Sequence, residues 1–342
     1  MKTKMKKTAV VLMSLIMVMC YMPMMAFADS AVVELNAETA DLQSEIDNAA
    51  DGTEFKLMSD ITTSDRILVV GKNITIDLNN FTWNSPVRSF HLIGANVTFK
   101  NGAITSANEN FFVTSTSYMA NAKDDAAKAI VAEYGITDDG KASTLNLENV
   151  NVTGNGGSSA IATNGTDHED NEIILKDTNV KGTWTAIYSP AENTKVSVDG
   201  GSLEGFTGIA IKGGTVTLNN TEVKGTGEGE DTVNNPAFAN SGWTDTGDAV
   251  YIETNYASNL GFKVDVTIKG GTYTSSNAKA LRVFTDVSDN VKVSVTGGTF
   301  NTDISKYLTG YYVQDETTGT VTYNPPTPTP TPTPTPDDNV TS

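Results

Sequence analysis

The chain has 342 residues, with 41 acidic and 23 basic side chains and a formal charge of −18. So negative a charge argues against a nucleic-acid partner and against an anionic membrane surface, because both need basic patches. Cys20 is the only cysteine, which excludes a disulfide scaffold and a cysteine-ligated zinc site. With 38% apolar residues, the chain is neither disordered throughout nor a multi-span membrane protein.

Residues 1–28 have the pattern of a secretory signal peptide. A lysine-rich start precedes an apolar stretch over 9–22, and an Ala-Phe-Ala triplet at 26–28 supplies the small residues that signal peptidase recognises. The apolar stretch is shorter than the roughly 20 residues that a membrane anchor needs, and Cys20 lacks the small preceding residues of a lipoprotein. The sequence therefore predicts a secreted, extracellular protein, free or associated with the cell wall, with no membrane insertion after signal removal.

Residues 29–52 are predicted to form an N-terminal cap. Leu42, Ile46 and Ala49 recur at helical spacing, so that one face of a short helix is apolar. Because stacked parallel strands leave an unpaired edge at each end, such a helix is expected to cover the first edge.

A repeat occupies the middle of the chain, and each copy has alternating apolar residues, a turn, and a short second stretch. In one copy Val264, Val266 and Ile268 share one face and polar residues share the other, which is typical of a half-buried strand. The turn residues are Asn, Asp or Gly, which tolerate a left-handed backbone. They are Asn80, Asn101, Asn149, Asp177, Gly200, Asn220, Gly270 and Gly297. Asparagines can also bind sugar hydroxyls, but we interpret this row as a structural turn ladder.

A second strand recurs between the first ones, at 90–94, 111–113, 160–163, 186–189, 208–212, 249–253 and 280–284. The residues left over are insertions at 114–143 and 225–247. Within 122–135 of the first insertion, Ala126, Ile130 and Val131, with Tyr134, predict a short amphipathic helix.

Stacked coils of this kind predict an all-β fold, a parallel β-helix of about eight coils over residues 53–323. Crossovers between parallel strands are almost always right-handed, which sets the predicted hand. The tyrosine-rich stretch 307–323 is expected to close the last coil, and the protein is expected to be a monomer. Residues 324–342 form a Thr-Pro-rich tail that favours an extended, solvated chain and is typical of a spacer.

The run over 42–80, the later segment 97–105 and the closing segments 266–284 and 293–323 resemble the pectate-lyase-like right-handed parallel β-helix superfamily. They are especially similar to surface β-helix proteins of Gram-positive anaerobic bacteria. The resemblance implies a fold rather than a function, because that superfamily includes lyases, hydrolases, esterases and adhesins. A lyase of this kind would use calcium held by carboxylates on one strand face, with an arginine as the base.

No catalytic set can be assigned from the sequence. None of the three arginines, Arg66, Arg88 and Arg282, lies in a recognisable lyase motif. The counterparts of Arg282 on earlier coils are Ala210, Tyr188 and Ala162, which are not carboxylates. The paired aspartates at 124–125 and 138–139 lie in the first insertion and are interpreted as helix-end and turn residues. The acidic run at 167–170 is interpreted as a solvated loop rather than a calcium site, and neither a metal nor a cofactor is predicted. His91 is expected to point outward, without partners that would make a metal site or a triad.

One constellation suits ligand binding. If Ile187, Ile209, Val250 and Leu281 point inward, then Tyr188, Tyr251 and Arg282 form an outward row along successive coils, with Trp243 from the second insertion beside it. Aromatic rings stack on sugar rings and arginine binds hydroxyls or carboxylates, so these four residues are the candidate glycan-binding site. The alternative is that the aromatic residues only cover the solenoid.

Three classes of function fit these observations. The favoured one is a secreted or cell-surface adhesin or carbohydrate-binding module without catalysis, whose partners are glycans or a host or cell-wall surface. The alternatives are an extracellular polysaccharide lyase or glycoside hydrolase, and a structural surface spacer.

Overall fold

The computed structural model describes residues 32–39, 41–228, 245–254, 262–284 and 290–326, all within one compact unit. The predicted signal peptide, the tail from residue 327 onward and Trp243 lie outside the described residues. None of the helices within these ranges has the length and apolarity that crossing a membrane requires.

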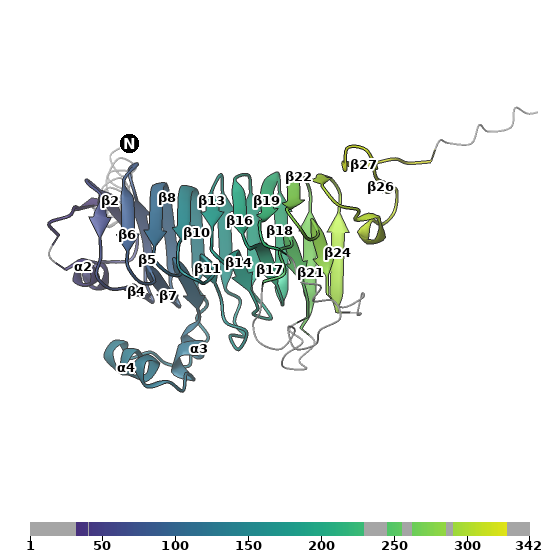
Figure 1. Ribbon diagram of the computed structural model, residues 1–342. Coiled ribbons are helices and arrows are strands. Elements are labelled where there is room, and N and C mark those ends of the chain that lie inside the picture. The colour runs from purple at the N-terminus through teal and green to yellow at the C-terminus, as the bar shows by residue number, and fades with distance from the viewer. Residues whose placement is uncertain (1–31, 40, 229–244, 255–261, 285–289, 327–342) are drawn as a thin grey trace, which may run out of the picture. The chain divides into compact units, whose positions relative to one another are not determined.

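Successive coils contribute parallel strands to three stacks (Figure 1). The first stack is β1 (Val32–Leu35), β2 (Thr53–Leu57), β5 (Asn73–Asp77), β8 (Asn96–Ser106), β10 (Thr144–Gly154), β12 (Glu172–Lys176), β15 (Lys195–Asp199), β18 (Gly214–Asn219), β21 (Val264–Ile268) and β24 (Val291–Val295). The second stack follows the turn of each coil and joins the first in one 17-stranded sheet. It comprises β3 (Ile61–Thr62), β6 (Thr82–Ser85), the later halves of β8 and β10, β13 (Asn179–Lys181), β16 (Ser202–Gly205), β19 (Thr221–Gly225), β22 (Gly271–Ser275) and β25 (Thr299–Phe300).

The third stack is a separate eight-stranded parallel sheet. Its strands are β4 (Ile67–Val70), β7 (Phe90–Ile93), β9 (Phe111–Thr114), β11 (Ile161–Ala162), β14 (Thr185–Ser189), β17 (Thr207–Ile211), β20 (Val250–Ile252) and β23 (Leu281–Val283). The large parallel sheets and their coil-to-coil register agree with the predicted solenoid.

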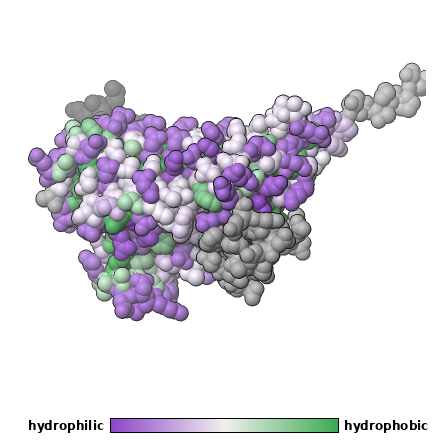
Figure 2. Space-filling model, in the orientation of Figure 1, coloured by the Kyte–Doolittle hydropathy of each residue, from purple (hydrophilic) through white to green (hydrophobic). Residues whose placement is uncertain are grey.

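The core lies between these stacks. In β21, Val264, Val266 and Ile268 are buried and the residues between them are half-buried, which confirms the predicted strand faces. Near the N-terminal coils the core is aromatic: Phe90 stacks on Phe111 with ring centroids 5.6 Å apart, and Trp83 lies 4.9 Å from Phe90. Figure 2 shows mainly hydrophilic residues over the visible face of the strands, as expected when alternation sends apolar side chains inward.

The turn ladder has the predicted left-handed backbone at six of its eight positions, with φ from 48° to 73°. These are Asn80, Asn101, Asn149, Asp177, Gly200 and Asn220. The last two positions are corrected: the left-handed residues there are Gly271, with φ 98°, and Gly298, with φ 107°. In both coils a Gly-Gly pair occupies the turn, so the backbone can place the left-handed conformation at the second glycine at no steric cost.

The predicted N-terminal helix is present as α2 (Leu42–Asn48), and Asp41 caps it by accepting a hydrogen bond from the Ser44 N–H at 3.0 Å. Ile46 is fully buried in the main core, against which Leu42 and Ala49 also pack. Gln43 donates to the Leu68 carbonyl oxygen and accepts from the Leu68 N–H, both at 2.8 Å. Its amide therefore satisfies the backbone of β4, the edge strand of the eight-stranded sheet.

The first insertion contains α3 (Thr116–Ala120) and α4 (Asp125–Tyr134). Ala127 and Ile130 are the buried residues of α4, whereas Ala126, predicted to be on the apolar face, is exposed. The two helices enclose a second, smaller core with outward-facing residues of the eight-stranded sheet, comprising Leu68, Ile93, Met119, Ala127, Ile130 and Ile136. The inward face of α4 therefore includes Ile130, Val131 and Tyr134 as predicted, with Ala127 in place of Ala126.

The described chain ends in a short helix, η4 (Ser305–Tyr307), and an antiparallel hairpin of β26 (Tyr312–Gln314) and β27 (Val321–Tyr323). Tyr307 and Val321 are buried in the main core, and Thr299 of β25 bridges to Thr320. This packing agrees with the expectation that residues 307–323 close the last coil.

Candidate functional site

The register of the predicted binding row is correct. Ile187, Ile209, Val250 and Leu281 are paired along the eight-stranded sheet and lie in the core. The positions that follow them are also paired and face outward, because side chains alternate along a strand. From the first coil to the last this row is Leu68, His91, Phe112, Ala162, Tyr188, Ala210, Tyr251 and Arg282.

The exposure expected of this row is wrong for Tyr251, of which only 1% is accessible. The Tyr251 hydroxyl donates a hydrogen bond to Glu253 Oε2 at 2.9 Å. Arg282 Nε lies 2.7 Å from Oδ2 of the fully buried Asp248. Tyr188 is half-buried. Since Tyr251 is buried and the Arg282 guanidinium is engaged by a carboxylate, these residues do not form a free strip for sugar stacking.

Beside the row lies a group of buried charges that the sequence analysis missed. Lys212 Nζ lies 2.7 Å from Glu253 Oε1, and the two side chains are 2% and 0% exposed. The same ammonium lies 5.8 Å from the centre of the Tyr188 ring. Lys212 directly follows β17 and Glu253 directly follows β20, so the signal was a pair of opposite charges at matching positions of adjacent coils.

Burial perturbs the titration of these groups. Burial raises the pKa of the Glu253 carboxyl above its ordinary value, and the Lys212 ammonium opposes that rise. Burial raises the pKa of Asp248 in the same way, against the Arg282 guanidinium. Burial raises the pKa of the Tyr251 hydroxyl, with Glu253 adding to the rise. Each shift has the sign expected when a charged form is removed from water.

His91 lies on the outward row as predicted, but it is 3% exposed. His91 Nε2 lies 3.0 Å from Thr114 Oγ1, and the ring lies 4.9 Å from that of Phe112. Burial, with Arg88 and Arg66 nearby, holds the pKa of His91 well below its ordinary value. His91 is therefore a packed, neutral side chain.

An accessible hollow lies where connections leave the carboxyl ends of β9 and β11. Parallel strands in register end at one edge, so the connection over 115–143 meets the connection over 163–171. Between them is a pocket of about 590 Å³, which we call the loop-edge pocket. It is lined by Ser117, Tyr118, Asn121, Ala122, Lys123, Asp138, Thr166, His168 and Glu169. Its volume is in the range of small-ligand sites.

Asp167 joins the two connections behind this pocket. Its carboxylate accepts hydrogen bonds from the Ser115 N–H and the Ser115 hydroxyl, both at 2.7 Å, and from Asn171 Nδ2 at 2.9 Å. The Glu169 N–H donates to it at 3.2 Å. Only 1% of Asp167 is exposed, so the interpretation of 167–170 as a wholly solvated loop is wrong at this residue and correct for the exposed Asp170.

The paired aspartates of the first insertion are helix-end and turn residues, as predicted. Asp124 caps α4 by accepting from the Ala127 N–H at 2.8 Å. Asp138 accepts from Asn121 Nδ2 at 3.1 Å, and Asp139 accepts from the Thr116 hydroxyl at 2.6 Å. Hydrogen bonds from side chains lower the pKa of Asp138 and of Asp139, so both carboxylates stabilise the wall of the loop-edge pocket in their charged forms.

The loop-edge pocket also contains groups that can meet a ligand. The Tyr118 ring packs edge-on against Phe112 at 6.0 Å, and its hydroxyl accepts from Asn164 Nδ2 at 3.1 Å. Lys123 and His168 are exposed on the pocket wall. His168 Nδ1 lies 3.3 Å from Glu192 Oε2, which leaves Nε2 directed elsewhere. The pocket thus combines one aromatic ring with charged donors and acceptors.

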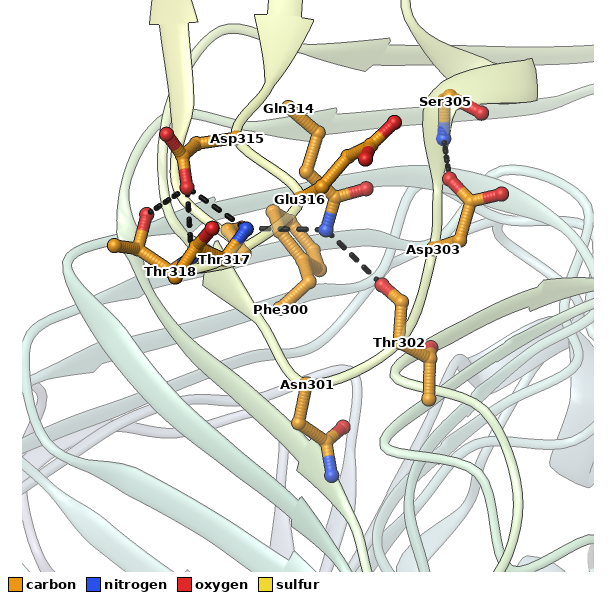
Figure 3. A pocket seen from close by; sticks show the side chains of 11 residues that line it. Phe300, Asn301, Thr302, Asp303, Ser305, Gln314, Asp315, Glu316, Thr317 and Thr318 are labelled. Atoms are coloured by element: carbon orange, nitrogen blue, oxygen red, sulfur yellow. Dashed lines mark hydrogen bonds between the residues drawn. The ribbon is translucent and has the colours of Figure 1, made fainter.

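A second hollow of about 490 Å³ lies beside the C-terminal hairpin (Figure 3). Its polar groups are engaged in the closure of the last coil. Gln314 accepts from the Ile304 N–H at 2.8 Å and donates to the Thr302 carbonyl oxygen at 3.1 Å. Asp315 accepts from the N–H groups of Thr317 and Thr318, at 2.9 and 2.7 Å. We therefore assign this hollow a structural role.

Exposed aromatic side chains also occur outside the lining of both hollows, and the sequence analysis did not assign them to a binding site. Trp184, Tyr311 and Tyr323 are 48%, 51% and 58% exposed. Tyr311 and Tyr323 lie edge-on at 6.1 Å. Nothing in the alternation of the sequence distinguished these rings, because Trp184 and Tyr311 lie next to strands and Tyr323 ends β27, so none is on the outward row.

Within the described ranges, no group of three or more His, Cys, Asp or Glu side chains is arranged to hold a metal ion. Comparison of the chain with protein-family models, with curated proteins and with solved structures finds no match.

Proposed function

We propose that this protein is a secreted or cell-surface glycan-binding module, built as a right-handed parallel β-helix of the pectate-lyase-like kind, with α2 as its N-terminal cap. The three stacks of parallel strands support the fold, and the general handedness of parallel crossovers supports the hand. The signal-like residues 1–28 support export, after which the module acts outside the cell or at its wall. A monomer suits this role, because each coil is already paired with its neighbours.

The observation that carries the proposal is the composition of the loop-edge pocket. Sugars present apolar C–H faces and a rim of hydroxyls, so their sites combine an aromatic ring with charged or amide side chains. Tyr118 supplies the ring, and Lys123, His168 and Glu169 supply donors and acceptors. This pocket replaces the predicted row of Tyr188, Tyr251 and Arg282 as the binding site. Trp243, which was predicted to lie beside that row, is outside the described residues.

Affinity for one sugar is expected to be low. An aromatic contact contributes about 1 kcal/mol beyond the area it buries, and the pocket has a single ring. Attachment to a surface would then depend on several copies engaging a polymer at once, which is the usual benefit of multivalency.

The proposal is tested by a glycan array followed by titration calorimetry on the best ligand. Tyr118→Ala should weaken binding about tenfold, because a loss of about 1.4 kcal/mol corresponds to that ratio. Lys123→Ala should also weaken binding, because it removes a charged donor from the pocket wall. The side chain is exposed, so its removal should leave the fold intact. Tyr311→Ala is the control, because it removes an exposed tyrosine ring outside the pocket and should leave the affinity unchanged.

The other functions are outcomes of the same experiment. Shortening of pectin or alginate by the wild-type protein, abolished with the Tyr118 variant, would replace the proposal with a polysaccharide lyase or hydrolase. Absence of binding to every glycan and to cell-wall preparations would leave the structural spacer as the function. Binding that survives in both pocket variants would place the glycan site elsewhere.

A further inference from the structure

Lys212 and Glu253 form the most deeply buried ion pair among the described residues. Lys212 follows β17 and Glu253 follows β20, and these strands pair in register. The two side chains are 2% and 0% exposed, and Nζ lies 2.7 Å from Oε1. The contact therefore joins two adjacent coils across 41 residues of chain.

The distance between the two atoms is that of a strong hydrogen bond, but their angles are not. Neither Lys212 Nζ nor Glu253 Oε1 makes a hydrogen bond to any partner, although the two atoms are 2.7 Å apart and both are buried. Charges withdrawn from water are stabilised only if good hydrogen bonds replace the lost hydration. Glu253 Oε2 accepts a hydrogen bond from Tyr251, but the Lys212 ammonium has no aligned acceptor, so the charged form of Lys212 is poorly stabilised where it lies.

An exposed pair of the same two residue types shows the difference. Lys181 Nζ lies 2.7 Å from Glu204 Oε1, but these side chains are 63% and 31% exposed. Hydrogen bonds from Lys181 lower the pKa of Glu204, whereas burial raises the pKa of Glu253. The pKa values of the two carboxyl groups are therefore shifted in opposite directions, although each carboxyl lies at the same distance from an ammonium. The buried carboxyl is the one that favours the neutral acid, the form in which a carbonyl carbon is open to attack.

We propose that Lys212 and Glu253 condense to form an amide that covalently cross-links the two coils. The ammonium passes one proton to the carboxylate, and the neutral Nζ then attacks Cδ of Glu253. A bond forms between Nζ and Cδ, one Cδ–O bond breaks, and the departing oxygen leaves as water with two protons from the amine. One ammonium and one carboxylate become one amide and one water, so atoms and charge balance without an oxidant, a reductant or a cofactor.

Tyr251 is placed to assist this reaction. Its hydroxyl donates to Glu253 Oε2 at 2.9 Å, so it can stabilise negative charge on that oxygen as the tetrahedral intermediate forms. It can also relay a proton from the amine to the departing oxygen, giving up its own proton and regaining one from Nζ. Burial raises the pKa of Tyr251, which keeps the hydroxyl in its donor form. Fixing the amine against the carboxyl within one fold replaces a bimolecular encounter, which greatly raises the effective concentration.

The product removes the two unfavourable groups. An amide is neutral, so the ion pair no longer has to be held away from water. The link also closes a loop in the unfolded chain and thus lowers its conformational entropy, as a disulfide does in proteins that have cysteines.

The experiment is peptide mapping of the full chain after complete denaturation and proteolysis. We expect a two-branched peptide joined through Lys212 and Glu253, one water lighter than its two parts, with backbone fragments from both branches in its tandem mass spectrum. The peptides containing Lys181 and Glu204, the exposed pair at the same distance, should remain separate. Recovery of Lys212 and Glu253 only in unlinked peptides overturns the proposal, whatever any variant does.

Two variants test the chemistry. Glu253→Gln should still form the link, but with loss of ammonia rather than water, because the leaving group is then an amide nitrogen. Tyr251→Phe keeps the ring and removes the hydroxyl, and it should slow the appearance of the joined peptide after refolding by about 10²-fold. An unchanged rate would overturn the role of Tyr251. Lys212→Arg should abolish the joined peptide, and its persistence would show that another amine is the nucleophile.

Discussion

Removal of the Asp167 carboxylate should be among the most destabilising single changes near the loop-edge pocket. Asp167→Ala leaves four donors without their acceptor: the Ser115 N–H and hydroxyl, the Asn171 amide and the Glu169 N–H. A buried donor that loses its partner costs about 1–3 kcal/mol. Water entering the vacated space and the removal of a buried charge offset part of this. We therefore expect a net loss of about 3 kcal/mol in the free energy of unfolding.

The assay is urea unfolding followed by circular dichroism, with a thermal scan beside it. For a domain of this size, about 3 kcal/mol corresponds to a fall in Tm of about 6–12 °C. Asp167→Asn should give an intermediate loss, because its amide keeps one acceptor oxygen and turns a donor toward the remaining N–H groups. Asp170→Ala is the control. That aspartate is exposed in the same loop, and its removal should change stability by no more than about 0.5 kcal/mol.

Glycan titration of the same variants connects stability with function. Because Asp167 holds the connection over 163–171 against the residue that caps α3, Asp167→Ala should also weaken binding at the loop-edge pocket. Equal stabilities for the Asp167 and Asp170 alanine variants would refute the reasoning, since they would mean that the four hydrogen bonds contribute nothing net.

Gly271→Ala should lower the free energy of unfolding by about 3 kcal/mol, since its φ is +98° and a Cβ would lie 2.1 Å from the Thr221 carbonyl oxygen. Gly270→Ala should cost less in the same urea titration, because the nearest atom, at 2.6 Å, belongs to a side chain that can move; an equal cost would contradict this assignment. Stability should fall as the pH drops below about 6.5, by up to about 1.4 kcal/mol per pH unit. The reason is that His91 becomes protonated in the unfolded chain, whereas burial keeps it neutral in the folded one. His91→Leu should remove that part of the pH dependence, and an unchanged slope between pH 5 and 7 would show that other groups cause it.

Local chemistry carried most of the fold prediction. Alternation of apolar and polar residues sets which face of a strand is buried, and Val264, Val266 and Ile268 follow it. Asn80, Asn101 and the other left-handed turn residues reveal where each coil bends, because few residue types adopt that conformation. Both signals act within a few residues, so a single sequence displays them. Repetition along the chain then predicts that strands stack coil upon coil.

The local signals were less exact where two conformations were equally open to the residues. A Gly-Gly pair can place the left-handed conformation at either glycine. In this coil the second glycine, Gly271, adopts it, and there the chain lies close against the Thr221 backbone. In the same way, the inward face of α4 depends on where the helix begins and on what it meets, so Ala127 rather than Ala126 is buried.

Whether each outward side chain is buried or exposed could be decided only by tertiary structure. Register predicted that Tyr188 and Tyr251 share one row and that His91 points outward, which is correct, but not that His91 and Tyr251 are buried. Burial of an outward side chain depends on segments that are remote in sequence and have no repeat to place them. The alternation within a strand cannot encode what covers it.

The loop-edge pocket and the pair of Lys212 and Glu253 arise in the same way. Asp167 meets Ser115 from 52 residues away, and Lys212 meets Glu253 only because one coil lies on the next. The sequence determines the strands, the bends and the register, since these follow from side-chain pattern and backbone preference over short distances. Only the folded chain decides which charges lose their water and which polar groups meet, because desolvation depends on every neighbour in space.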